Sequence, residues 1–143
     1  MIKTFKEFLE EGYSNEEIEG NENLVLKVFD KNVEFKPTNE EGILTYMEAD
    51  ELMNGEWEML SGEEWDYIRD NYECVWDNEQ KGLLIDGRIL LPSVDGKFGE
   101  YWVPEHIGPD RTFETFYFDD EGNVEQGYKE ENEKCQVRLV RYV

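Results

Sequence analysis

The segment Trp57-Glu58-Met59-Leu60-Ser61-Gly62-Glu63-Glu64-Trp65 lies where the chain changes from helical to strand-like hydrophobic spacing. Within it, Ser61-Gly62-Glu63-Glu64 has the form of a capping box, in which the serine and glutamate side chains each accept a hydrogen bond from the other residue's backbone amide. Trp65 and Ile68 are three residues apart and would share one face of a helix. We therefore expect a helix that begins after Ser61 and ends near Asn71.

Two further helices are expected upstream of this segment. Thr45-Tyr46-Met47-Glu48 is a second capping box, and Met47, Leu52 and Met53 would supply the apolar side of the helix that it begins. Residues 2–11 are predicted to form a short amphipathic helix that ends at Gly12. Its apolar positions recur at three- and four-residue spacing: Ile2, Phe5, Phe8 and Leu9.

The remainder of the chain has the two-residue hydrophobic period of strands. Asp120-Glu121-Gly122-Asn123 is predicted to be a hairpin turn, because glycine tolerates the positive φ that such turns require. Helices first and short antiparallel strands after predict an α+β domain. The expected strands are Leu24–Phe29, Val33–Phe35, Glu73–Trp76, Leu83–Ile85, Arg88–Leu91, Glu100–Val103, Thr112–Phe118, Asn123–Tyr128 and Gln136–Tyr142.

Composition predicts one folded domain with an unusually acidic surface. The 143 residues include 36 acidic and 14 basic side chains, a net charge of −22, yet 14% of the residues are aromatic. The aromatic share argues against disorder, and the charge disfavours direct binding to nucleic acid or to anionic membranes. We expect residues 1–20 to contain the N-terminal amphipathic helix and residues 21–143 to form a single domain.

The sequence also predicts where the protein works. No stretch approaches the roughly 20 apolar residues that a membrane span needs, and the N-terminus leads into no apolar signal region. We expect the chain to work in a cytoplasm, that of a host cell included, or to be packaged inside a particle such as a virion, without secretion.

Five segments, in order, resemble the C-type-lectin-like domains of bacteria and phages, which belong to the superfamily of the formylglycine-generating enzyme. Their motifs are W-R-L-P-T-x-E-E-W, I-x-L-P-A-A-G, G-Y-Y-W-S-S, Y-x-F-x-x-G-x-V and V-R-x-V-R. The resemblance implies two helices packed on short twisted antiparallel strands, in a domain that binds and seldom catalyses. The matching segments are Trp57–Trp65, Ile89–Pro92, Gly99–Trp102, Phe116–Val124 and Val137–Arg141.

Recognition in such folds uses long loops on a rigid scaffold, and the loop around Phe98–Arg111 is the candidate binding face. The candidate binding residues are Phe98, Glu105, His106, Asp110 and Arg111. By contrast, Trp57, Trp65 and Trp102 are expected in the core with their indole N–H groups satisfied. Arg138 and Arg141 are expected to pair with carboxylates.

The first 12 residues resemble the head-targeting peptides of T-even-type phages, which a prohead protease removes. Leu9-Glu10-Glu11 fits the cleavage motif, so the resemblance implies a processing site at Leu9, Glu11 and Gly12, with the cut before Gly12. The alternative is an ordinary N-terminal helix packed on the domain.

Catalytic and metal chemistry find little support in the sequence. His106 is the only histidine, and Cys74 and Cys135 are too few for a cysteine zinc site. We expect both cysteines to be reduced thiols, with a disulfide between them as the alternative. Asp119–Asn123 lacks the ligand spacing of a calcium loop and is expected to be a solvated hairpin. We therefore predict no enzyme, no cofactor and no metal.

The leading hypothesis is a phage-encoded, non-enzymatic protein-binding module that could be packaged in the virion, with a host or phage protein as its partner. The alternative is an acidic nucleic-acid mimic that inhibits a host defence or repair protein, of the anti-restriction or anti-CRISPR type. Its net charge of −22 corresponds to the charge on roughly 37 Å, or about 11 base pairs, of duplex DNA. One continuous acidic stripe would favour the mimic, whereas scattered acidic groups would count against it.

Overall fold

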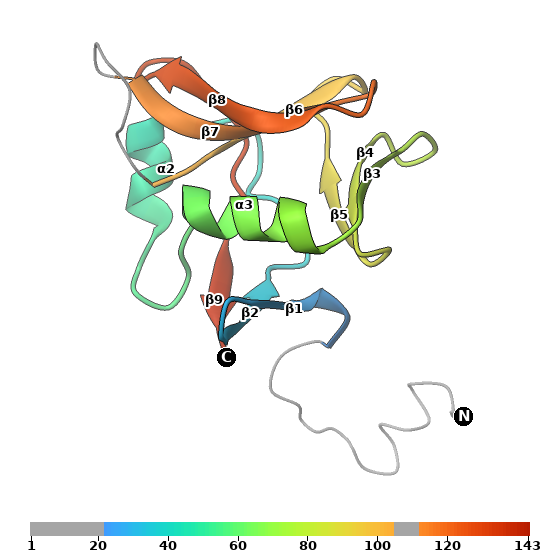
Figure 1. Cartoon of the computed structure of the whole chain (residues 1–143). Helices are drawn as coiled ribbons and strands as arrows, with labels where there is room; N and C mark the ends of the chain where they lie inside the picture. The colour runs from blue at the N-terminus through green and yellow to red at the C-terminus, as the bar shows by residue number, and fades with distance from the viewer. Residues whose placement is uncertain (1–21, 105–111) are drawn as a thin grey trace, which may run out of the picture.

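The computed structural model describes residues 22–104 and 112–143. Within these ranges the chain forms three antiparallel sheets of three strands each and two short α-helices (Figure 1). The elements are η1 (Glu22–Leu24), β1 (Val25–Val28), β2 (Lys31–Phe35), α2 (Tyr46–Leu52), α3 (Gly62–Asn71), β3 (Cys74–Asp77), β4 (Gly82–Ile85), β5 (Ile89–Pro92), β6 (Phe98–Trp102), β7 (Thr112–Asp119), β8 (Val124–Glu130) and β9 (Val140–Tyr142).

The predicted α+β class, with a C-type-lectin-like packing of two helices on strands, is wrong, because the described chain is β-rich. Strands lie near all of the predicted positions, but α2 has seven residues and α3 has ten. The two capping boxes mark helix starts clearly in the sequence, so the helical content was overestimated. Most buried hydrophobic side chains instead belong to strands and to the segments between them. The predicted helix over residues 2–11 lies outside the described residues.

Both predicted capping boxes are confirmed. At α3, the Ser61 hydroxyl accepts from the Glu64 amide at 3.2 Å and the Glu64 carboxylate accepts from the Ser61 amide at 2.9 Å. Thr45 and Glu48 make the same reciprocal pair at α2. These bonds satisfy backbone donors that a helix N-terminus otherwise leaves free.

The sheet β1-β2-β9 joins the start and the end of the described chain. Val33 pairs with Tyr142 and Phe35 with Val140, while β1 forms one edge. The Tyr72 hydroxyl covers part of that edge, because it accepts from the Lys27 amide at 3.1 Å and donates to the Lys27 carbonyl at 2.7 Å. Figure 1 shows this sheet on one side of α3 and the sheet β6-β7-β8 on the other.

The turn between β1 and β2 carries backbone strain. Phe29 has a φ of 56°, in the left-handed region that favours glycine. For a side chain with a Cβ atom this conformation costs about 1–2 kcal/mol. The strained residue is nevertheless a large aromatic one whose side chain is 47% exposed.

Arg138 departs from its predicted role as a partner for carboxylates. The residue is only 4% exposed, and its guanidinium donates to backbone carbonyls and to one amide side chain. Nε donates to the Lys36 carbonyl at 2.8 Å, Nη1 to Leu90 and Asn39 at 3.0 Å, and Nη2 to the Pro37 carbonyl at 3.3 Å. Burial lowers the pKa of Arg138 from its usual value. The guanidinium thus ties the chain after β2 to β5.

The tryptophans are only partly as expected. Trp102 is buried and its Nε1 donates to the Leu44 carbonyl at 2.6 Å. Trp65 is buried and stacked on Phe116 with ring centroids 4.1 Å apart, but its Nε1 has no acceptor among the described residues. Trp57 is half-buried and packs against the edge of the core cluster that contains Trp102, rather than lying inside it.

The two buried indoles give a matched pair of predictions. Trp102→Phe and Trp65→Phe remove similar volumes, but only the first removes a hydrogen bond, and only the second removes an unsatisfied buried donor. We expect Trp102→Phe to lower the free energy of unfolding by about 2 kcal/mol more than Trp65→Phe does. Urea unfolding of both variants measures the difference, and equal losses would contradict the assignment of the two N–H groups.

Candidate functional site

The structure does not bring the predicted binding residues together into one described site. Phe98 begins β6, and its ring stacks on Tyr117 with centroids 5.9 Å apart. Glu105, His106, Asp110 and Arg111 lie outside the described residues, and so do the predicted processing residues Leu9, Glu11 and Gly12. The loop-face prediction therefore stays a prediction.

A hollow of about 410 Å³ lies instead at β9, and we call it the Arg141 hollow. It is lined by Gly55, Glu56, Arg141, Tyr142 and Val143. Two segments distant in sequence form it, namely the connection between α2 and α3, and strand β9. The amide and carbonyl of Glu58 pair with the carbonyl and amide of Val140, both at 2.8 Å, and fix the two segments side by side.

Local hydrogen bonds shape the first of these segments. The Asn54 side-chain oxygen accepts from the amides of Glu56 and Trp57, both at 2.9 Å. Gly55 has a φ of 94°, a conformation that suits glycine in this turn. The turn places Glu56 at the hollow and Trp57 beside it.

Arg141 is held from three directions. Its Nε donates to Glu34 at 2.7 Å and its Nη1 to Glu56 at 2.8 Å. The guanidinium carbon lies 4.9 Å from the centre of the Trp57 ring, and Lys36 Nζ lies 5.0 Å from the same ring. Hydrogen bonds from Arg141 to Glu34 and Glu56 raise its pKa, so the side chain is a fixed cation. The predicted pairing of Arg141 with carboxylates is confirmed.

Tyr142 is held by Glu64, which lies in the first turn of α3, the helix that Ser61 caps. Its hydroxyl donates to Glu64 Oε2 at 2.8 Å, and Lys31 Nζ lies 4.3 Å from the centre of its ring. Lys31 also pairs with Glu64 at 3.0 Å. Burial alone would raise the pKa of Glu64, but the hydrogen bonds from Ser61, Lys31 and Tyr142 lower it overall. Burial and the Glu64 carboxylate raise the pKa of Tyr142.

The chemistry of the Arg141 hollow is that of binding. It presents a charged guanidinium stacked on an indole, a protonated phenol and a carboxylate, all held by defined partners. Both cysteines are unpaired, and burial raises the pKa of Cys74 to about 11 and that of Cys135 as well. Within residues 22–104 and 112–143, no three histidine, cysteine or acidic side chains are grouped as metal ligands. None of the helices described is long and apolar enough to cross a membrane.

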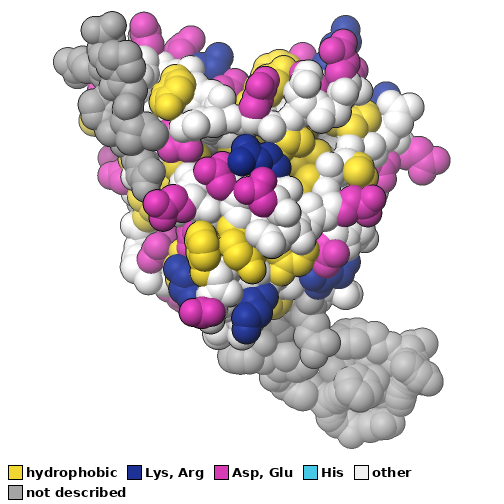
Figure 2. Space-filling view, in the orientation of Figure 1, with side chains coloured by type: hydrophobic (Ala, Val, Ile, Leu, Met, Phe, Trp, Pro, Cys, Tyr) yellow, Lys and Arg dark blue, Asp and Glu magenta, His cyan; other side chains and the backbone are white. Residues whose placement is uncertain are grey.

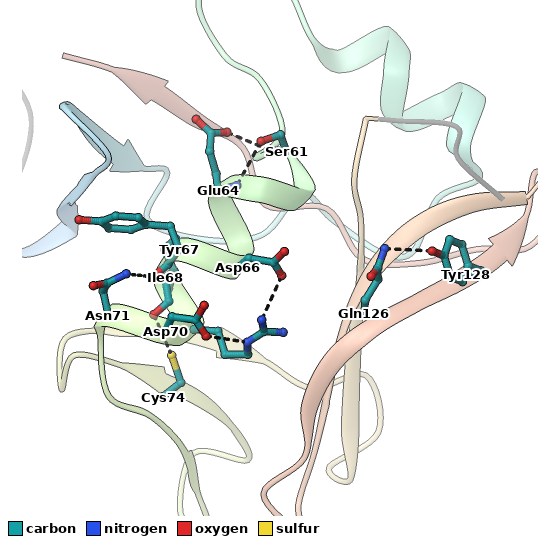
Figure 3. A network of polar contacts seen from close by, with 11 residues as sticks. Ser61, Glu64, Asp66, Tyr67, Ile68, Asp70, Asn71, Cys74, Gln126 and Tyr128 are labelled. Carbon is teal, nitrogen blue, oxygen red and sulfur yellow. Dashed lines mark hydrogen bonds and ion pairs between the residues drawn. The ribbon is translucent and has the colours of Figure 1, made fainter.

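Acidic side chains do not form a continuous stripe on the face that Figure 2 shows. They alternate there with basic and hydrophobic side chains. On α3, Arg69 pairs with Asp66 at 3.4 Å and with Asp70 at 3.3 Å (Figure 3). On this face the acidic side chains are therefore interleaved with other groups rather than gathered in one patch.

Comparison with protein-family profiles, curated protein sequences and solved structures finds no match to this chain. The resemblances of the five ordered segments and of the N-terminal peptide therefore stay predictions. Sequence reasoning missed the Arg141 hollow, because Arg141 meets partners 107 and 85 residues away. No local sequence signal links Trp57 to Arg141, because the two residues are far apart in the chain.

Proposed function

We propose that this chain is a non-enzymatic protein-binding module whose contact surface is centred on the Arg141 hollow. The observation that carries the proposal is that Arg141 and Tyr142 line one hollow, and that the guanidinium of Arg141 lies 4.9 Å from the centre of the Trp57 ring. Arginine, tryptophan and tyrosine are the residues that dominate binding energy at protein interfaces, usually where they surround a pocket.

Rigidity of the surface supports the same proposal. Glu34 and Glu64 are buried acids that hold Arg141 and Tyr142 by hydrogen bonds, while Glu58 pairs the two segments through the backbone. Side chains fixed before binding lose less conformational entropy when a partner arrives. The hollow is therefore suited to a defined contact rather than to loose adhesion.

Charge favours a basic surface on the partner. The whole chain has a net charge of −22, and the Glu56 side chain at the hollow is 61% exposed. A basic partner would be attracted over long range by the net charge and could pair with Glu56 at close range. A host or phage protein, including one that normally binds nucleic acid, meets this description.

Capture of partners from bacterial lysate tests the proposal when it is combined with a surface variant. We expect the wild-type chain to retain a partner at ~0.5 M salt, where interactions between exposed charges are largely screened. Trp57→Ala should weaken that capture at least about tenfold, because it removes the ring beneath Arg141. Met47→Ala is the matched control, since Met47 is the most exposed large hydrophobic residue described and lies on α2.

Two outcomes would count against this account. Loss of every partner at high salt would favour the acidic-mimic alternative over a shaped contact. Equal capture by the wild type and by Trp57→Ala would remove the Arg141 hollow from the interface, provided that circular dichroism shows the variant to be folded.

A further inference from the structure

A second surface feature lies between α3 and the β1–β2 turn. Phe29 contacts Tyr67 of α3, with ring centroids 4.7 Å apart and an angle of 49° between the rings. Figure 2 shows hydrophobic side chains gathered between α3 and the β1–β2 hairpin. Figure 3 shows Tyr67 leaving the helix on the side opposite Asp66. We call the pair of rings the Phe29 patch.

The Phe29 patch combines strain with exposure. Phe29 holds a φ of 56° in a turn where glycine or asparagine would be relaxed, yet it keeps nearly half of its side chain exposed. Strained backbone persists where the surrounding structure or a bound group compensates for it. The contact with Tyr67 covers only part of the ring, so the exposed part is available to a further apolar group.

We propose that the apolar side of residues 2–11 of the same chain covers the Phe29 patch. Ile2, Phe5, Phe8 and Leu9 recur at helical spacing and would form a single apolar stripe about as wide as one helix face. A short amphipathic segment of this kind gains stability chiefly by packing its apolar side against a folded surface. The patch offers two aromatic rings for such packing.

The length of the connecting chain permits this contact. Ten residues, 12–21, separate the segment from Glu22, and an extended chain of ten residues reaches up to roughly 33 Å. Phe29 lies seven residues after Glu22, so the Cα atoms of these two residues are at most about 25 Å apart. The connection can therefore turn back along β1 and place the segment at the patch.

Charge favours the chain's own segment over a second copy of the protein. Each copy has a net charge of −22, so two copies repel one another when they approach. A tethered segment meets no such barrier and has a high effective concentration at the patch. Pairing between copies would moreover depend on protein concentration.

Amide hydrogen exchange on the full chain tests the proposal. We expect amides of residues 5–9 to exchange at least about tenfold more slowly than unstructured amides of the same sequence. Phe29→Ala should abolish most of this protection, and Phe8→Ser, which changes only the segment, should do the same. Met47→Ala alters another exposed apolar residue, on α2, and should leave the protection unchanged.

Three results would overturn the proposal. The first is rapid exchange of residues 5–9 in the wild-type chain. The second is slow exchange that persists in Phe29→Ala, which would place the segment elsewhere or make it self-stable. The third is protection that disappears on dilution, which would identify a second copy as the occupant.

Discussion

Arg138→Met is expected to lower the free energy of unfolding by about 3–5 kcal/mol. The guanidinium is 4% exposed and donates to the carbonyls of Lys36, Pro37 and Leu90 and to the Asn39 side chain. Methionine fills a similar volume but donates nothing. The substitution thus leaves several buried acceptors without this partner, and each such loss costs more than an exposed hydrogen bond does.

Arg141→Met provides the control, because it removes an arginine three positions along the chain. Arg141 pairs with the exposed Glu56 and with Glu34, which is only 7% exposed. We therefore expect its loss to cost more than the ~1 kcal/mol of an exposed ion pair, but less than the loss of the buried Arg138. Chemical unfolding of both variants compares the two sites directly. Similar losses for the two substitutions would show that the buried guanidinium does not join the chain after β2 to β5 as described.

Gly99→Ala is expected to lower the free energy of unfolding by about 3 kcal/mol. A Cβ atom built at Gly99 would lie 2.3 Å from Cζ of Phe118, far inside van der Waals contact. The Phe118 ring is fully buried and stacks on Tyr101 with centroids 6.0 Å apart, so it has little room to move. The strain falls on the paired strands β6 and β7.

A double variant separates this steric effect from a general cost of losing glycine. Phe118→Leu destabilises on its own, but it shortens the side chain that the new methyl group would meet. Gly99→Ala combined with Phe118→Leu should therefore cost less than the sum of the two single changes. Additive losses would contradict the predicted contact between position 99 and the Phe118 ring.

The parts of the fold that local sequence determines were predictable. Capping boxes at Thr45 and Ser61 depend on residues three positions apart, and the Asp119–Asn123 hairpin depends on Gly122, whose φ is 93°. The period-two segments likewise located the strands. The fold class was wrong because the two clearest local signals start helices of only seven and ten residues.

The candidate site was not predictable, because it depends on contacts between segments that are far apart in the sequence. Whether a half-buried Trp57 faces the core or the solvent depends on which strand lies beside it, and that strand comes from the C-terminal end of the chain. Arg138 and Arg141 are alike in sequence context, yet one is buried among carbonyls and the other is paired with acids at the surface. Only the tertiary arrangement distinguishes them.

The most direct test of the proposed binding surface is the hydrogen-exchange footprint of a captured partner on the full chain. We expect slowed exchange at residues 54–58 and 140–143, which line and flank the Arg141 hollow, and at residues 31–35 of the neighbouring strand β2. Slowed exchange confined to Phe98–Trp102 and Thr112–Asp119, with the Arg141 hollow unchanged, would contradict it and would place binding on the sheet that carries Phe98.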